Sequence, residues 1–393
     1  MEASLYVHVP FCESGKCDYC DFFSVPVNCG QAAADERLAV YVESLLAEAE
    51  SLFDALPVEK VQTVYIGGGT PSVLGAALIR RLLNGLSRLT GRFSLPSIEV
   101  TVEANPESAD EAFLAALREA GASRLSLGVQ TFHSPSMRAV HRTGASCDEA
   151  KLHERLRLAS EYFPCAFSAD LLSGLPLQNE TILSNDINTL LSYKPAHVSL
   201  YALTVEDGTA LTKQKAGVLL PGEDEADALW LLGRDLLEKA GYGQYEVSNF
   251  CLSGKESLHN IRYWRMENWL ALGPSASGTL IDDETGTGFR YIVPKEIKYG
   301  DILKCINDGA FVERLDAPTL MKETILMGFR YINGPDEALF RRRFSMGIND
   351  LIPETLNAWR GLLQCDKPAL SKDGLLLLNR FLLDAFKEIE TSV

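Results

Sequence analysis

The chain has 393 residues, of which 46% are hydrophobic and 23% are charged, a composition typical of a globular protein with a large core. Its formal net charge of −16 argues against nucleic acid and acidic membrane surfaces as general partners. The opening residues MEASLYVHVPFC contain neither a basic stretch nor a long apolar run, so we expect no export signal, no integral membrane segment and a cytoplasmic location.

Up to about residue 205, short β-rich runs alternate with segments whose apolar residues recur at helical spacing. Strands are predicted at Leu5–Val9, Thr63–Ile66, Ile98–Val102, Arg124–Val129, Ala166–Leu172 and Ala196–Leu200. Helices are predicted between them at Glu36–Leu56, Ala76–Leu89, Asp110–Ala120, Cys147–Glu161 and Thr181–Ser192. This succession favours a parallel sheet curved into an open or partial barrel. The loops after the strands of such a barrel line one rim, where functional residues usually lie.

The pattern changes after about residue 205. Glu223–Ala240 is predicted as one amphipathic helix, Gly241–Gly278 is rich in glycine and aromatic residues, and Asp282–Gly288 reads as an acidic turn or hairpin. Further helices are predicted at Pro318–Arg330, Asp336–Phe344, Ile352–Leu363 and Asp373–Phe386. We therefore expect an α/β fold in three parts. These are a partial (βα)6 barrel, a flanking segment, and a mainly helical, winged-helix-like C-terminal domain, at residues 1–205, 206–300 and 301–393.

Three of the nine cysteines lie close together directly after the first predicted strand, in the segment YVHVPFCESGKCDYCDFF. The other six are widely spaced, so they do not indicate a disulfide framework, and reduced thiols are expected. Cys12, Cys17 and Cys20 are then available as metal ligands. Their spacing alone leaves two possibilities: a zinc site completed by Cys29 or His8, or an iron–sulfur cluster with one iron open.

A glycine-rich turn, YIGGGTP at Tyr65–Pro71, follows the second predicted strand. Consecutive glycines let the backbone approach a ligand closely, and exposed backbone groups can bond an amino or carboxylate group. Taken alone, the turn is better explained as a tight connection between a strand and a helix. Its place on the same rim as the three cysteines favours a ligand-binding role.

The cysteine loop and the glycine turn together resemble the radical S-adenosylmethionine (SAM) superfamily. The resemblance implies that Cys12, Cys17 and Cys20 hold a 4Fe–4S cluster with SAM at the open iron, and that an electron from a donor such as flavodoxin or ferredoxin splits SAM into a 5′-deoxyadenosyl radical. Four residues separate Cys12 from Cys17, one more than is usual in the superfamily, and Gly15 is expected to accommodate the additional residue as a bulge.

Further motifs, in order along nearly the whole chain, resemble the branch that contains the coproporphyrinogen dehydrogenases (HemN) and the HemW-type haem chaperones. These motifs are Glu103–Pro106, Leu125–Phe132, Asp170–Pro176, Ser199–Thr204 and Gly241–Phe250. The resemblance implies SAM contacts at Tyr6, Tyr19, Gly68, Gly69, Thr70, Glu103, Gln130, Arg142 and Asp170. Glu103, Gln130 and Asp170 each stand at or near a predicted strand end, where their oxygens can reach ribose hydroxyls.

Two features separate the haem chaperones from the enzymes of this branch. The enzymes carry a fourth cysteine two positions after the third, whereas this chain has Phe22 there. The segment HNIRYW resembles the HNxxYW signature of HemW-type chaperones, which implies haem contacts at His259, Tyr263 and Trp264. A neutral imidazole is a good axial ligand for haem iron, and aromatic rings can pack on the macrocycle.

The residues of this motif also have structural interpretations. A lone histidine beside aromatic residues is commonly a buried group that bonds a neighbour, and this alternative stays open for His259. Arg262 and Arg265 suit haem propionates as well as surface salt bridges.

We therefore expect a radical SAM haem chaperone that binds a 4Fe–4S cluster, SAM and haem and delivers haem to acceptor proteins. Two alternatives remain. One is an oxygen-independent coproporphyrinogen III oxidase that uses the 5′-deoxyadenosyl radical, and the other is a degenerate haem-binding member without a working cluster. The sequence leaves open whether SAM is cleaved, and no catalytic residue is assigned.

Overall fold

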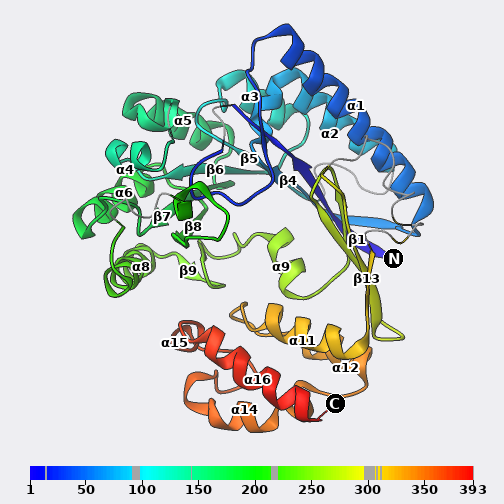
Figure 1. Cartoon of the computed structure of the whole chain (residues 1–393). Helices are drawn as coiled ribbons and strands as arrows, with labels where there is room; N and C mark the ends of the chain where they lie inside the picture. The colour runs from blue at the N-terminus through cyan, green and yellow to red at the C-terminus, as the bar shows by residue number, and fades with distance from the viewer. Residues whose placement is uncertain are drawn as a thin grey trace.

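The computed structural model describes residues 1–13, 16–90, 98–142, 144–213, 220–295, 306, 309 and 312–392. Gly15, which was expected to accommodate the longer spacing between Cys12 and Cys17, lies outside the described residues. Figure 1 shows a curved sheet at the centre, helices around its outer side, and the C-terminal helices below it.

Six of the described strands run parallel and form the centre of the molecule, and a seventh parallel strand, β11 (Trp269–Leu272), pairs with the first of these six. The six are β1 (Glu2–Val9), β4 (Lys60–Gly68), β5 (Glu99–Ala104), β6 (Arg124–Gln130), β7 (Phe167–Ser173) and β8 (His197–Ala202). They lie side by side in that order. Parallel neighbours need crossover connections, and these place the helices on the outer face of the curved sheet. The predicted six-stranded partial barrel is confirmed.

The crossover helices lie close to their predicted positions. They are α1 (Ala32–Ala55), α2 (Gly75–Thr90), α3 (Glu111–Glu119), α5 (Glu149–Tyr162) and α6 (Glu180–Ser192). Asp110, Asp148 and Asn179 begin three of them, because each side chain accepts a hydrogen bond from the backbone N–H three residues later. The short helix α4 (Ser134–Ala139) and the 3-10 turn η2 (Gly144–Cys147) were not predicted, whereas the 3-10 turn η1 (Pro71–Leu74) begins directly after the glycine turn.

The sheet continues on both sides of its parallel centre. Beyond β1 lie β11 (Trp269–Leu272), β12 (Ser277–Asp282), β13 (Thr287–Ile292) and β14 (Val312–Leu315). Beyond β8 lie β10 (Asn249–Cys251) and β9 (Gly243–Gln244). The turn predicted at Asp282–Gly288 joins β12 and β13 as a hairpin. The strands within residues 241–278 were missed because they are only two to four residues long, too short for a clear alternation.

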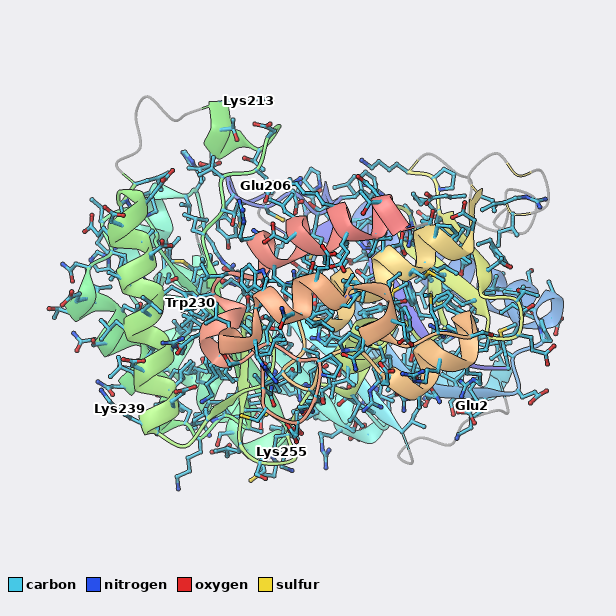
Figure 2. The ribbon with its side chains drawn as sticks, turned by 90° about the horizontal axis from the view of Figure 1, so that it is seen from below. Glu2, Glu206, Lys213, Trp230, Lys239 and Lys255 are labelled. Carbon is cyan, nitrogen blue, oxygen red and sulfur yellow. The ribbon has the colours of Figure 1, made fainter. Side chains whose placement is uncertain are left out.

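Two short strands and three helices complete the described region around the barrel. β2 (Phe11–Cys12) and β3 (Val25–Pro26) pair with each other at the base of the cysteine loop. Helix α8 (Glu223–Lys239) packs beside β8 and is preceded in the chain by α7 (Ala210–Lys213). Trp230 of α8, labelled in Figure 2, donates a hydrogen bond of 3.0 Å from Nε1 to the Leu200 carbonyl and so fixes α8 against β8. Helix α9 (Leu258–Trp264) lies below the sheet in Figure 1.

The C-terminal part is mainly helical, as predicted, and Figure 2 shows its helices crossing the lower side of the molecule. They are α11 (Ala317–Gly328), α12 (Glu337–Phe344), α13 (Ile348–Leu351), α14 (Pro353–Ala358), α15 (Lys372–Leu375) and α16 (Leu378–Ser392), with the 3-10 turn η3 (Arg360–Leu362). The prediction of one helix over Ile352–Leu363 was wrong. The helix ends at Ala358, and Trp359 then packs edge-on against Phe381, with ring centroids 5.5 Å apart.

The sheet continues past the boundary predicted at residue 205, since β9 to β13 belong to the flanking segment and join the barrel strands. The boundaries at 205 and 300 and the winged-helix-like character of the last part remain predictions. No helix in the described part of the chain is both long enough and apolar enough to span a membrane.

Candidate functional site

The carboxyl ends of the parallel strands surround a cavity of about 420 Å³. The three clustered cysteines line it, and so do eight of the nine residues predicted to contact SAM, namely Tyr19, Gly68, Gly69, Thr70, Glu103, Gln130, Arg142 and Asp170. The ninth, Tyr6, is not part of the cavity wall formed by the described residues. Its hydroxyl lies 3.1 Å from Nδ1 of His8. The fold thus gathers nearly the whole predicted set at one rim.

The cysteine loop is closed at its base by the pairing of β2 with β3, which places Cys12 at the edge of the cavity. Thr70 donates a hydrogen bond of 3.6 Å from its hydroxyl to Sγ of Cys12, and so links the loop to the glycine turn. Burial raises the pKa of Cys17 and raises that of Cys20 to about 11. Thiolates at these positions therefore need a positive partner such as an iron ion.

The three thiols would suit an iron–sulfur cluster, because Cys12, Cys17 and Cys20 all line the same cavity. Among the described residues, no group of three or more His, Cys, Asp and Glu side chains converges on one metal ion. A 4Fe–4S cube held by three thiolates binds each thiolate to a different iron, so its sulfurs surround a volume. The predicted fourth zinc ligands also lie elsewhere: Cys29 contacts the Val73 carbonyl at 3.8 Å, and the His8 ring is bonded to Tyr6 and to a backbone carbonyl.

The glycine turn serves close packing as well as ligand access. A Cβ atom at Gly69 would lie 2.7 Å from the Phe11 carbonyl oxygen, and one at Gly68 would lie 2.6 Å from the His8 ring. Gly68 also has a φ of 111°, which other residues rarely adopt. The glycines therefore let β4 approach the start of the cysteine loop. A side chain at either position would prevent this close packing.

Two carboxylates, Glu103 of β5 and Asp170 of β7, line the cavity on either side of β6. Glu103 accepts a hydrogen bond of 2.7 Å from the Tyr65 hydroxyl and one of 3.2 Å from the Gly68 N–H. Burial raises the pKa of Glu103 to about 7, and burial also raises the pKa of Asp170 to about 6. Because burial disfavours the charged forms, these positions favour a ligand that brings an ammonium group or hydroxyls.

Arg142 supplies the fixed positive charge of the site. Its guanidinium donates hydrogen bonds of 3.0 Å to the Tyr19 hydroxyl, 2.9 Å to Oδ1 of Asn105 and 3.0 Å to the Gly128 carbonyl. Burial opposes its charge, but Tyr19 and Cys17 outweigh this effect and raise its pKa. Arg142 therefore stays protonated and holds the cysteine loop against the rim of the barrel.

The cavity also contains residues that the sequence did not single out. Asn105 bridges Arg142 and Thr70, with its Nδ2 donating to the Thr70 hydroxyl at 3.0 Å. Glu107 has a buried Oε2 that accepts no hydrogen bond from any described residue. Tyr201 is 42% exposed and lines the same cavity. Asn105 directly follows the end of β5, and Tyr201 lies near the end of β8. Their positions at strand ends could have identified them from the sequence as residues of the rim.

His259 lies in the interior, away from the cavity. It is fully buried, with 0% of its surface exposed. Its Nδ1 lies 2.7 Å from the Thr63 hydroxyl and its Nε2 lies 2.9 Å from the Tyr263 hydroxyl, so both ring nitrogens are engaged. Burial lowers its pKa to about 3, and the ring is therefore neutral. This arrangement matches the structural interpretation of the motif, and ligation of haem iron would require one of these hydrogen bonds to break.

The other residues of the HNxxYW segment also have partners within the protein. Tyr263 packs edge-on against Trp269 with ring centroids 5.0 Å apart, and the Arg330 guanidinium lies 5.1 Å above the Trp264 ring. Arg262 forms an ion pair with Glu267, and Arg265 lies within 4.0 Å of the same carboxylate. Glu267 is thus a salt-bridge partner for both arginines, as expected if they form surface salt bridges instead of binding haem propionates.

The class of protein follows from the part of the chain that builds this rim. The family model of the radical SAM superfamily matches residues 6–187, which span the cysteine loop, the glycine turn, both carboxylates and Arg142. This superfamily implies a 4Fe–4S cluster and SAM as cofactors.

Curated relatives define the family within this class. The chain is 35% identical to the heme chaperone HemW of Lactococcus lactis over 357 residues, which cover 90% of this chain and 88% of the relative. It is 31% identical to the Bacillus subtilis heme chaperone HemW, with 96% and 97% covered. It is 33% identical to the bovine mitochondrial radical S-adenosyl methionine domain-containing protein 1, with 91% and 75% covered. The chain therefore belongs to the HemW family of the radical SAM superfamily.

A solved structure supports the fold. The Escherichia coli coproporphyrinogen III oxidase HemN, described as a radical SAM enzyme, aligns with a TM-score of 0.77 over 98% of this chain and 89% of its own. The sequence identity is 21%, so the likeness concerns the fold. It extends from the barrel to the C-terminal helices.

Proposed function

We propose that the chain is a haem chaperone that binds a 4Fe–4S cluster and SAM at the barrel rim and delivers haem to acceptor proteins. One observation carries the cofactor part: three partly exposed cysteines and eight predicted SAM residues line a single cavity of about 420 Å³. The haem part rests on identities of 31–35% to relatives named heme chaperone HemW over most of the chain.

Cys12, Cys17 and Cys20 would hold the cluster. A cluster held by three thiolates supplies one iron without a protein ligand, and it supplies an electron received from a donor such as flavodoxin or ferredoxin.

The residues of the cavity match the polar groups of SAM. Glu103 and Asp170 offer carboxylates to an amino group or to ribose hydroxyls, and Gln130 offers an amide beside them. Gln130 has a φ of 70° at a bulge in the pairing of β6 with β7, a strained position of the kind that occurs at functional sites. Arg142 places a cation where a carboxylate group can approach.

Anaerobic reconstitution with iron and sulfide tests the cofactor part. We expect the absorption and EPR signals of a 4Fe–4S cluster, a change in the EPR signal when SAM is added, and loss of both when Cys12, Cys17 and Cys20 are replaced together by Ala. Replacement of Cys29 by Ala is the matched control and should leave both signals intact. A cluster that survives the triple replacement would contradict the assignment of its ligands.

A second assay separates the chaperone from the enzyme. We expect the purified protein to bind haem with a defined absorption band and to pass it to an apo haem protein. We expect it to leave coproporphyrinogen III unchanged in the presence of SAM and reductant. Formation of protoporphyrinogen would overturn the chaperone proposal in favour of the oxidase. Haem binding without any cluster signal would instead indicate the degenerate family member.

A further inference from the structure

A column of aromatic rings in contact runs through the inside of the barrel from α9 towards the cysteine loop. It consists of Tyr263, His259, Tyr65, Tyr6 and His8, and we call it the lumen column. Successive ring centroids are 4.9, 5.1, 6.2 and 6.0 Å apart. The residues come from α9, β4 and β1, and the helices of the barrel cover the opposite face of these strands.

The middle of the column, at Tyr65, and its upper end, at His8, reach the two parts of the candidate SAM site. The Tyr65 hydroxyl donates a hydrogen bond of 2.7 Å to Oε1 of Glu103, whose Oε2 accepts the Gly68 N–H at 3.2 Å. His8 is bonded to the Tyr6 hydroxyl, and its Nε2 donates to the Phe23 carbonyl at 2.9 Å. The column therefore contacts the carboxylate that faces the cavity and also the end of the cysteine loop.

The lower end of the column is anchored by α9. Glu99 of β5 accepts hydrogen bonds from the backbone N–H groups of Leu258 and His259, at 3.1 and 2.9 Å, and so fixes the start of this helix below the barrel. Thr63 and Tyr263 then hold the His259 ring from its two nitrogens. The ring is thereby fixed in place directly under Tyr65, at a tilt of 32°.

We propose that His259 is a positioning residue for SAM binding, acting through Tyr65 on Glu103. The inference rests on the proposed SAM site and goes beyond it, because it gives the histidine of the HNxxYW segment a role other than haem ligation. A fully buried ring with both nitrogens engaged is rigid, and its removal leaves a void under Tyr65. Tyr65 can then move down and withdraw its hydroxyl from Glu103.

Three variants test this chain of contacts in the reconstituted protein. Tyr65→Phe removes only the hydroxyl that bonds Glu103, and His259→Ala removes the ring beneath it. We expect each to weaken SAM binding, measured by calorimetry, by about tenfold, the effect of one hydrogen bond to a charged group. His259→Phe keeps a flat ring without a nitrogen, and we expect its SAM affinity to stay within about threefold of the unmodified protein.

His197 provides a matched control. It is also buried, with 2% exposed, and its ring nitrogens lie 2.7 Å from the Ser168 hydroxyl and 2.8 Å from the Tyr245 hydroxyl. His197 lies outside the lumen column. We expect His197→Ala to lower the melting temperature as His259→Ala does, while SAM affinity and the EPR change caused by SAM remain as in the unmodified protein.

The same variants separate this inference from haem ligation. If His259 is a positioning residue, haem titration gives the same band and affinity for His259→Ala, His259→Phe and the unmodified protein. Loss of the haem band in both His259 variants with unchanged SAM affinity would overturn the inference and establish the residue as a haem ligand. Unchanged SAM affinity in both Tyr65→Phe and His259→Ala would also overturn it. If the unmodified protein binds no SAM, the proposed function itself has failed.

Discussion

The guanidinium of Arg142 donates a hydrogen bond of 3.0 Å to the hydroxyl of Tyr19, two residues that lie 123 positions apart in the chain. This contact joins the cysteine loop, after β1, to the loop that follows β6. Through Asn105 the same guanidinium also reaches the end of β5. One buried cation thus holds three loops of the rim together, and the geometry of the cavity depends on it.

Replacing Arg142 by Ala should therefore damage both stability and the site. Tyr19, Asn105 and Gly128 would each lose a buried donor, and we expect a loss of about 3 kcal/mol in the free energy of unfolding. Urea unfolding measures the loss, and iron and sulfide analysis after reconstitution should reveal a lower cluster content. Arg80→Ala is the control, because the ion pair of Arg80 with Glu119 is exposed and should contribute less than about 1 kcal/mol. Equal losses of stability in Arg142→Ala and Arg80→Ala would contradict the conclusion that Arg142 holds the loops of the rim together.

Glu48 makes the stability of the fold depend on pH. This carboxyl of α1 is 3% exposed and accepts the Gly273 N–H at 3.2 Å, and burial raises its pKa to about 7. Its folded-state pKa lies above the unfolded value of 4.5, so the folded chain binds the proton more tightly. The contribution of Glu48 therefore falls as pH rises from about 4.5 to about 7.

Glu48→Gln should remove this dependence while it keeps an oxygen for the Gly273 N–H. We expect the variant to be more stable than the unmodified chain by up to about 3 kcal/mol at pH 8, and to differ little at pH 4.5. Urea unfolding at the two pH values measures both differences. Glu43→Gln is the control on the same helix, because Glu43 is exposed and pairs with Arg81. A stability difference for Glu48→Gln that is independent of pH would show that its carboxyl does not titrate as described.

Gly69→Ala should displace the cysteine loop. The new Cβ would lie 2.7 Å from the Phe11 carbonyl oxygen and 2.9 Å from the Phe11 and Val9 backbone, so β2 has to shift. We expect a loss of about 1–3 kcal/mol in the free energy of unfolding and weaker SAM binding after reconstitution. Gly222→Ala, where a Cβ meets no atom within 4 Å, should change neither quantity. Normal SAM affinity in Gly69→Ala would mean that the loop tolerates the shift.

Asp283 links the hairpin of β12 and β13 to α12. Its carboxylate lies 2.6 Å from Nε of Arg343, a buried residue, and 2.8 Å from a terminal nitrogen of Arg342. Asp283→Ala leaves the buried Arg343 charge unpaired, and we expect a loss of about 3 kcal/mol. Arg342→Ala removes the exposed partner and should cost less than about 1 kcal/mol. Thermal and urea unfolding measure the stability lost in each variant. Similar losses in Asp283→Ala and Arg342→Ala would show that the pair with the buried Arg343 stabilises the fold no more than the exposed pair does.

Local signals in the sequence were strong enough to predict the barrel and its rim. Alternating apolar residues in the strands, helical spacing between them and capping side chains such as Asp110 and Asn179 are short-range properties, so they can be recognised without knowing the fold. The cysteine loop and the glycine turn each follow a strand directly. Because the carboxyl ends of parallel strands share one edge, strand order alone brought their residues to the same cavity.

The interior contacts could not be predicted in this way. Whether His259 faces a ligand or the barrel depends on Thr63, almost two hundred residues earlier, and on the ring of Tyr65. The short strands β10 and β9 owe their form to pairing, β10 with β8 and β9 with β10, rather than to their own residues. Thus the sequence by itself determined the family, the barrel and the residues of the rim, because these depend on local patterns and strand ends. Only the tertiary structure decided that the HNxxYW histidine is buried, since burial and hydrogen-bond partners are set by distant segments packing together.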